Sequence, residues 1–127
     1  MIAGIGTDLV DIRRLQASID KLGDKFIQRI LTPTEIEQWE AISNADRACA
    51  FVAKRFAAKE AAVKALGTGI GRGVSFQHFE VSNLPSGQPI LNVSDELDHH
   101  FDGKVKWHLS LTDERDYAQA FVIVEAI

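Results

Sequence analysis

Two segments, one near each end of the chain, are apolar at nearly every position. Residues 2–10 are apolar and interrupted by glycine, which predicts a short strand buried on both faces. Residues 117–126 are apolar in both side-chain directions, which predicts a strand covered by a helix of the same chain or by another subunit. Residues 104–112 instead alternate strictly and predict a strand with one buried face. The apolar positions of this alternation are Val105, Trp107, Leu109 and Leu111.

Helical spacing of apolar residues fills the chain between the first strand and Leu66. We expect a helix over residues 12–22, capped by Asp11 and ended by Gly23, followed by a short helical segment over residues 24–31. Thr32 and Glu35 then have the spacing of a capping box, and Pro33 fits the first position of a helix. This pattern predicts a helix that runs to about Ile42.

The longest predicted helix begins at Asn44 or Asp46, runs to Leu66 and ends in the glycine-rich residues 67–73. Strands are predicted over residues 74–83 and 90–93, and a short helix over residues 95–101. A strand, then helices, then strands without repeats or linkers predict a single α+β domain over residues 1–127.

Composition excludes several classes of protein. The 127 residues carry a net charge of −4 and are 46% hydrophobic, which is ordinary for a globular chain and argues against a general nucleic-acid binder. No apolar run approaches the length of a membrane span, and the first residues do not have the pattern of a signal peptide. Cys49 is the single cysteine, so no internal disulfide can form. We therefore expect a cytoplasmic protein.

Glu60 interrupts the apolar stripe of the longest helix. Its carboxylate falls on the core-facing side, four residues after Phe56 and three before Val63, where an unpaired charge is costly. The simplest interpretation is an ion pair with Lys64, one helical turn later. Asp8 is a second carboxylate, in a strand that we expect to be buried. Together the two acids would make an oxygen site suited to Mg²⁺, which takes one or two carboxylates, waters and phosphates.

Cations lie close to Glu60 in the sequence. Arg55, Lys59 and Lys64 share its helix, and the glycine-rich loop follows, so this region could hold phosphate groups bridged by Mg²⁺. The loop alone is weak support, because helix capping and a turn would also explain its glycines. His108, on the polar side of its strand, could extend the anion site or be an ordinary solvated residue.

Three motifs together resemble the bacterial holo-acyl-carrier-protein synthases, the short phosphopantetheinyl transferases. They are residues 4–10 (GIGTDLV), residues 55–69, which begin RFAAKEA and end KALGTG, and residues 108–112 (HLSLT). The match covers almost the whole chain in order and spacing. It implies the fold of that family, in which a long central helix packs on antiparallel strands.

The resemblance also implies an activity. Coenzyme A would donate 4′-phosphopantetheine to a serine hydroxyl of apo acyl carrier protein in fatty acid biosynthesis, with release of adenosine 3′,5′-bisphosphate. Asp8 and Glu60 match the family's Mg²⁺ ligands, and Glu60 and Lys64 its catalytic residues. The family's active site lies between subunits of a homotrimer. Positions that match its coenzyme A contacts are Arg55, Lys59, Lys64, Gly67, Gly69, Pro89 and His108.

Residues 13–29 carry a local charge of +3 and match the helix on which the family docks the acidic carrier protein. A solvated helix face would show the same charges. The basic residues that we expect to dock the carrier are Arg13, Arg14, Lys21 and Lys25. Asp113 stands where many members of the family have histidine, so a role of that histidine does not transfer.

The base that would take the serine proton stays open among a water molecule, Glu35 and Glu37. Two other functions also stay open. One is a different Mg²⁺-dependent nucleotide or phosphoryl enzyme that uses the same two carboxylates, and the other is a non-catalytic oligomeric module that binds anions.

Overall fold

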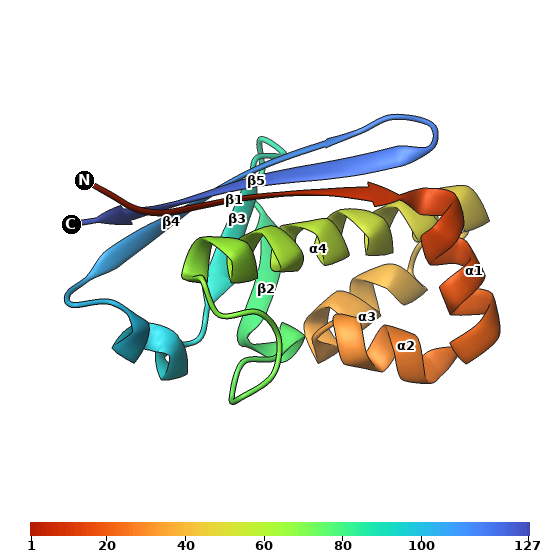
Figure 1. Ribbon diagram of the computed structural model, residues 1–127. Coiled ribbons are helices and arrows are strands. Elements are labelled where there is room, and N and C mark those ends of the chain that lie inside the picture. The colour runs from red at the N-terminus through yellow and green to blue at the C-terminus, as the bar shows by residue number, and fades with distance from the viewer.

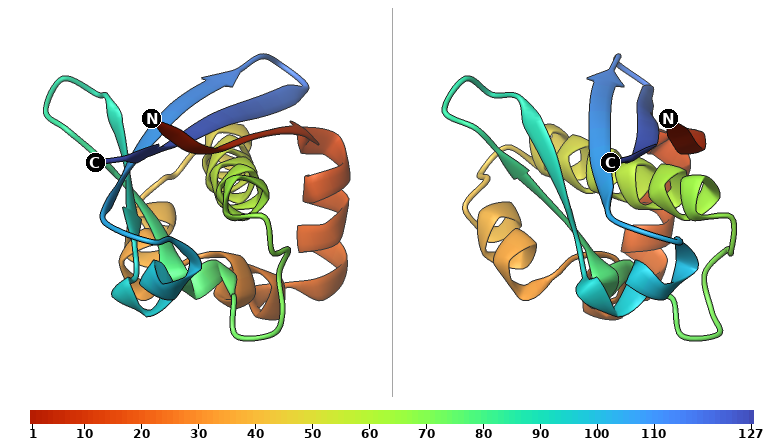
Figure 2. Two further views of the ribbon diagram at one scale, coloured as in Figure 1. Left: turned by 60° about the vertical axis from the view of Figure 1, so that its left-hand side comes forward. Right: turned by 90° about the vertical axis from the view of Figure 1, so that its left-hand side faces the viewer.

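Helix α4 (Ala45–Leu66) lies at the centre of the fold in the computed structural model, which describes residues 1–127 (Figure 1). Viewed nearly along its axis, the helix has a sheet above it, helix α1 (Ile12–Leu22) on one side and a two-stranded hairpin on the other (Figure 2). The expected α+β fold with a long central helix is confirmed. None of the helices combines the length and hydropathy that crossing a membrane requires.

The main sheet has three antiparallel strands in the order β1-β5-β4. They are β1 (Ile2–Asp11), β4 (Val105–Asp113) and β5 (Tyr117–Ala126), and the two chain ends lie side by side at one end of this sheet (Figure 1). The hairpin is formed by β2 (Phe79–Asn83) and β3 (Pro89–Val93). Burial alternates along β4, as the sequence predicts. It also alternates along β5, because only the face toward α4 is covered by this chain.

The helix boundaries follow the predicted caps. Asp11 accepts a hydrogen bond from the Arg13 backbone N–H at the start of α1, and Thr32 and Glu35 form the capping box of α3 (Pro33–Glu40). Asn44 rather than Asp46 caps α4. Helix α2 (Asp24–Ile30) lies between α1 and α3. Helix α3 ends at Glu40, slightly before the predicted end at Ile42, because the chain turns at Ala41.

Small residues let β1 and α4 approach each other closely. The face of α4 toward the core is built largely of alanine, and a side chain at Gly4 or Gly6 would overlap the backbone carbonyl of Ala65 or Ala61. Only glycine fits at such a distance. This close packing fixes the distance between α4 and the β1 side chains that follow Gly6.

Two predictions about the strands are wrong. Strand β1 is not buried on both faces, because Ile5 and Leu9 are 57% and 62% exposed on the side away from α4. Residues 74–83 do not form one strand. Ser75 and His78 cap a 3₁₀ turn over Phe76–His78, and the strand begins only at Phe79.

Candidate active site

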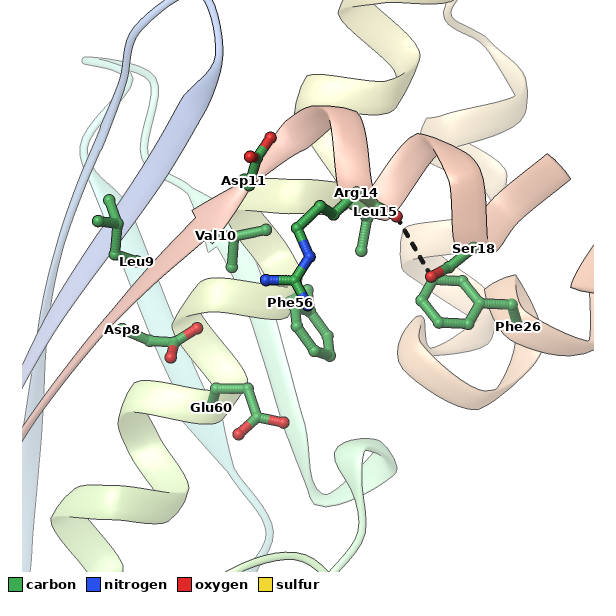
Figure 3. Close-up of a pocket in the computed structure, with 10 residues that line it drawn as sticks. All are labelled: Asp8, Leu9, Val10, Asp11, Arg14, Leu15, Ser18, Phe26, Phe56 and Glu60. Atoms are coloured by element: carbon green, nitrogen blue, oxygen red, sulfur yellow. Dashed lines mark hydrogen bonds between the residues drawn. The ribbon is translucent and has the colours of Figure 1, made fainter. Parts of the chain in front are cut away.

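Asp8 and Glu60 line one cavity of about 440 Å³ between β1, α1 and α4. Asp8 follows Gly6 on the side of β1 that faces α4, and Glu60 precedes Ala61, so the glycine contact brings the two acids together. Figure 3 shows both carboxyl groups directed into this space. The structure thus brings the two predicted carboxylates to one cavity.

Lys64 pairs with Asp8 and not with Glu60. Its Nζ lies 3.1 Å from Asp8 Oδ1 and donates a second hydrogen bond to the Thr7 carbonyl oxygen at 2.9 Å. The simple interpretation of Glu60 as the partner of Lys64 is thus wrong, because a strand that is remote in sequence presents the better acceptors. The Asp8 side chain is 16% exposed, and that of Lys64 is 55% exposed.

Glu60 forms no ion pair in the chain. Burial raises the pKa of its carboxyl group, and the nearby Asp8 carboxylate raises that pKa further. A bound cation would relieve both effects. The site offers two carboxylates, and no group of three or more His, Cys, Asp or Glu residues capable of holding a metal occurs in the chain. Two carboxylates with room for water and phosphate fit Mg²⁺.

Lys59 lies on another side of α4 and is fully buried. Its Nζ is 2.6 Å from Glu35 Oε1 and donates to the Ile30 carbonyl oxygen at 2.7 Å. Glu35 also accepts hydrogen bonds from the backbone N–H groups of Thr32 and Val81. The expectation that Lys59 contacts coenzyme A does not fit this burial, because its ammonium group is held inside the protein.

The structure also places Glu35 and Glu37, the two carboxylates considered as the base that would take the serine proton. Glu35 is fully buried in its pair with Lys59, so its carboxylate cannot reach a substrate. Glu37 is exposed on α3, and no residue of α3 lines the cavity that holds Asp8 and Glu60. Within one chain, neither of these two carboxylates faces the cavity.

Arg55 also lies outside this cavity. Its guanidinium stacks 3.8 Å above the Phe51 ring and donates to Asn83 Oδ1 at 3.2 Å, next to Pro89 across the hairpin. The side chain is buried, its Nε has no hydrogen-bond partner, and burial lowers its pKa. A buried guanidinium with an unpaired N–H favours an anionic ligand.

His108 lies on the face of the main sheet opposite Asp8. Strand register pairs Asp8 with Ala120 and His108 with Ile123, and positions three apart on a strand face opposite ways. His108 Nε2 is 2.9 Å from Glu125 Oε1, and this contact lowers the pKa of Glu125. His108 cannot reach the cavity of its own chain.

Gly67 and Gly69 have positive φ angles in the exposed loop after α4.

The four predicted docking residues do not share one environment. Arg13 forms ion pairs with Asp11 and Asp116, so its charge is largely satisfied within the chain. Arg14 lines the cavity and points into it (Figure 3). Lys21 and Lys25 are exposed and form no ion pair.

The sequence analysis did not predict that Arg14 lines the cavity. It also did not predict the apolar wall of the cavity. That wall is formed by Val10, Leu15, Phe26 and Phe56. One signal was present in the sequence, because Arg14 and Ser18 are one turn apart on the side of α1 that also carries Leu15.

The chain is similar to known proteins over almost its whole length. Residues 4–122 match the model of the 4′-phosphopantetheinyl transferase superfamily. The chain belongs to this superfamily. A holo-[acyl-carrier-protein] synthase of Marinomonas sp. is 67% identical over 99% of both chains, and one of Shewanella denitrificans is 50% identical over 98% of both. The resemblance to bacterial holo-acyl-carrier-protein synthases is therefore confirmed.

Solved structures of the superfamily share the fold over the full length. The Neisseria meningitidis holo-[acyl-carrier-protein] synthase is 38% identical, with a TM-score of 0.89 over 99% of this chain and 100% of that one. The Bacillus anthracis synthase, solved in complex with CoA (3′,5′-ADP), is 40% identical with a TM-score of 0.86 over 100% and 99% of the two chains. These two synthases thus share the fold of this chain.

Proposed function

We propose that this chain transfers 4′-phosphopantetheine from coenzyme A to a serine hydroxyl of apo acyl carrier protein. The observation that carries the proposal is the convergence of Asp8 and Glu60 on one cavity, in a chain that matches holo-[acyl-carrier-protein] synthases over its full length. The serine oxygen forms a bond to the phosphorus that bears pantetheine. The bond from this phosphorus to the bridging oxygen breaks, and adenosine 3′,5′-bisphosphate leaves.

Asp8 and Glu60 would hold Mg²⁺, with Lys64 beside them. The metal, when bound, supplies positive charge to the pyrophosphate. Lys64 binds a phosphate oxygen through its exposed ammonium group, and Arg14 adds a second cation from α1. A water molecule takes the serine proton in this proposal, since Glu35 is fully buried in its pair with Lys59 and Glu37 does not line the cavity.

Coenzyme A would lie between two copies of the chain in a homotrimer. Asp8 and His108 occupy opposite faces of the sheet, so a site that uses both needs His108 from a neighbouring copy. The uncovered face is also apolar, with Ile5, Leu9 and Phe121 all more than 40% exposed. Arg55 lies beside Pro89, so the two expected coenzyme A contacts are neighbours.

The carrier protein would dock on α1 and α2, beside the mouth of the cavity. Lys21 and Lys25 have free charges there and Arg14 points inward, whereas Arg13 contributes less because Asp11 and Asp116 neutralise it. Attraction of an acidic carrier to this face speeds encounter and weakens with salt. We place the reaction in the cytoplasm, in the supply of holo carrier protein for fatty acid biosynthesis.

Chromatography of the nucleotide product tests the proposal against its alternatives. We expect adenosine 3′,5′-bisphosphate to form from coenzyme A only when apo carrier protein and Mg²⁺ are both present. Release of orthophosphate would favour a different phosphoryl enzyme. Binding of coenzyme A without any product, with several apo carriers tried, would favour an anion-binding module.

A further inference from the structure

Lys64 is held by two oxygen atoms of β1 that are adjacent in the chain. Its Nζ contacts the Thr7 carbonyl oxygen at 2.9 Å and Asp8 Oδ1 at 3.1 Å. Both contacts join the last turn of α4 to the strand that carries one of the two cavity carboxylates. Lys64 therefore neutralises Asp8 within the chain.

This contact can be released, unlike the other lysine pair of α4. The Lys59–Glu35 pair is fully buried, with three further hydrogen bonds that fix its two side chains. The Lys64 side chain is 55% exposed, so water can solvate its ammonium group when it leaves Asp8. Exposed ion pairs of this kind are weak, because water solvates the separated charges well.

A divalent cation on Asp8 and Glu60 would compete with Lys64 for the same carboxylate. Direct coordination of Mg²⁺ or Mn²⁺ by carboxylate oxygen requires a separation of about 2 Å. An ammonium group on the same carboxylate would then repel the metal at close range. Arrival of the metal thus favours departure of Lys64, one turn beyond Glu60 on the same helix.

We infer that Lys64 is a displaceable internal counter-ion, which occupies Asp8 in the metal-free chain and is released toward a phosphate group when a divalent cation binds. The inference rests on the proposed function for the identity of the site. The release of Lys64 would couple the binding of the metal to the binding of the phosphate ligand. A bound metal would attract the phosphate itself and would also free the Lys64 ammonium group to bind it. Lys64 consequently weakens metal binding when no phosphate ligand is present. When the metal is bound, Lys64 strengthens the binding of the phosphate ligand.

Titration of the protein with Mn²⁺ alone, followed by the electron paramagnetic resonance signal of free Mn²⁺, tests the inference without any reaction. We expect Lys64→Met to lower the Kd for Mn²⁺ about fivefold, the scale of an exposed ion pair. Lys64→Arg keeps the charge and leaves the Kd near the wild-type value. The matched control is Lys54→Met, which removes an α4 lysine paired with Asp113 at 3.8 Å and leaves the Kd unchanged.

A Kd that is unchanged or raised in Lys64→Met would overturn the inference. Glu60→Gln in the same titration separates this failure from failure of the metal site itself. If Glu60→Gln weakens Mn²⁺ binding while Lys64→Met does not strengthen it, the site stands and only the counter-ion role is lost. If Glu60→Gln binds Mn²⁺ as the wild type does, both the metal assignment and the inference fail. Circular dichroism confirms that each variant is folded.

A second titration measures the coupling directly, with adenosine 3′,5′-bisphosphate as the probe. In the wild type, saturating Mn²⁺ should lower the Kd of this nucleotide by a larger factor than in Lys64→Met, because only the wild type gains a freed ammonium group. Equal factors in the two proteins would contradict the release of Lys64.

Discussion

Gly6 of β1 lies against the backbone of α4 so closely that a Cβ atom there would overlap the carbonyl oxygen of Ala61. Glu60 immediately precedes Ala61, and Asp8 follows Gly6 on the same side of its strand. One glycine contact therefore sets the separation of the two cavity carboxylates. The packing of the fold and the chemistry of the site depend on the same position.

Gly6→Ala should impair both stability and activity. Overpacking against a backbone atom that cannot move aside is expected to cost about 3 kcal/mol, measured by urea unfolding. Because β1 must move away from α4, Asp8 moves with it and transfer activity falls. Gly103→Ala is the control, since a Cβ atom at that glycine meets no atom within 4 Å and its φ angle is ordinary. Equal stability of the two variants would refute the close-contact account.

Lys59→Met should destabilise the protein without touching the cavity. It leaves the Glu35 carboxylate buried without its cation, which typically costs about 3–5 kcal/mol. Addition of Glu35→Gln removes the uncompensated charge and should restore part of the stability. Lys54→Met should change the free energy of unfolding by less than about 1 kcal/mol, because its pair with Asp113 is partly exposed. A similarly small effect of Lys59→Met would show that the buried pair is not intact.

Glu60→Gln should stabilise the metal-free protein while abolishing transfer. Burial and Asp8 raise the pKa of Glu60 above its ordinary value of 4.5, so the folded state disfavours the ionised form. Between that value and the raised pKa, the folded state binds more protons than the unfolded state, and stability falls as the pH rises. Glutamine removes this penalty. The variant should therefore have a higher Tm than the wild type near pH 8, and this difference should vanish near pH 4.

Calorimetry of the two proteins in EDTA across this range of pH measures the effect. A wild-type Tm that equals or exceeds the Tm of the variant at pH 8 would contradict the raised pKa. Transfer at wild-type rates by Glu60→Gln would contradict its assignment as a metal ligand.

Phe121→Asp should disrupt assembly while leaving the single chain folded. The Phe121 side chain is 41% exposed on the uncovered face of the sheet, where it shares the surface with Ile5 and Leu9. A carboxylate at the centre of an apolar interface is costly to bury. We expect sedimentation velocity to show a trimer for the wild type and a monomer for the variant, with loss of transfer. A monomeric and fully active wild type would contradict the shared site.

Local signals in the sequence predicted most of the fold. Asp11, Thr32 and Asn44 cap their helices through hydrogen bonds to residues two or three positions away, so their neighbours in sequence are sufficient to recognise them. The same locality explains one error. Ser75 and His78 hydrogen-bond across a 3₁₀ turn, and this competes with the strand that the apolar pattern of the segment predicts.

The site could be predicted in part only. Asp8 and Glu60 stand out because each places a carboxylate among apolar residues. The partners of Lys59 and Lys64 could not be found in this way, because they come from α3 and β1 and depend on how the elements pack. Helical spacing suggested Glu60 as the partner of Lys64, yet the Asp8 carboxylate and the Thr7 carbonyl oxygen together accept the hydrogen bonds of its ammonium group.

Intact-mass spectrometry can show whether this chain modifies a carrier protein with phosphopantetheine at the Asp8–Glu60 site. Apo acyl carrier protein is incubated with the chain, coenzyme A and Mg²⁺, with parallel samples that contain EDTA or the Glu60→Gln variant. We expect a mass gain of one phosphopantetheine in the first sample and none in the other two. An unmodified carrier in the first sample, with the enzyme folded and several apo carriers tried, would contradict the proposed function.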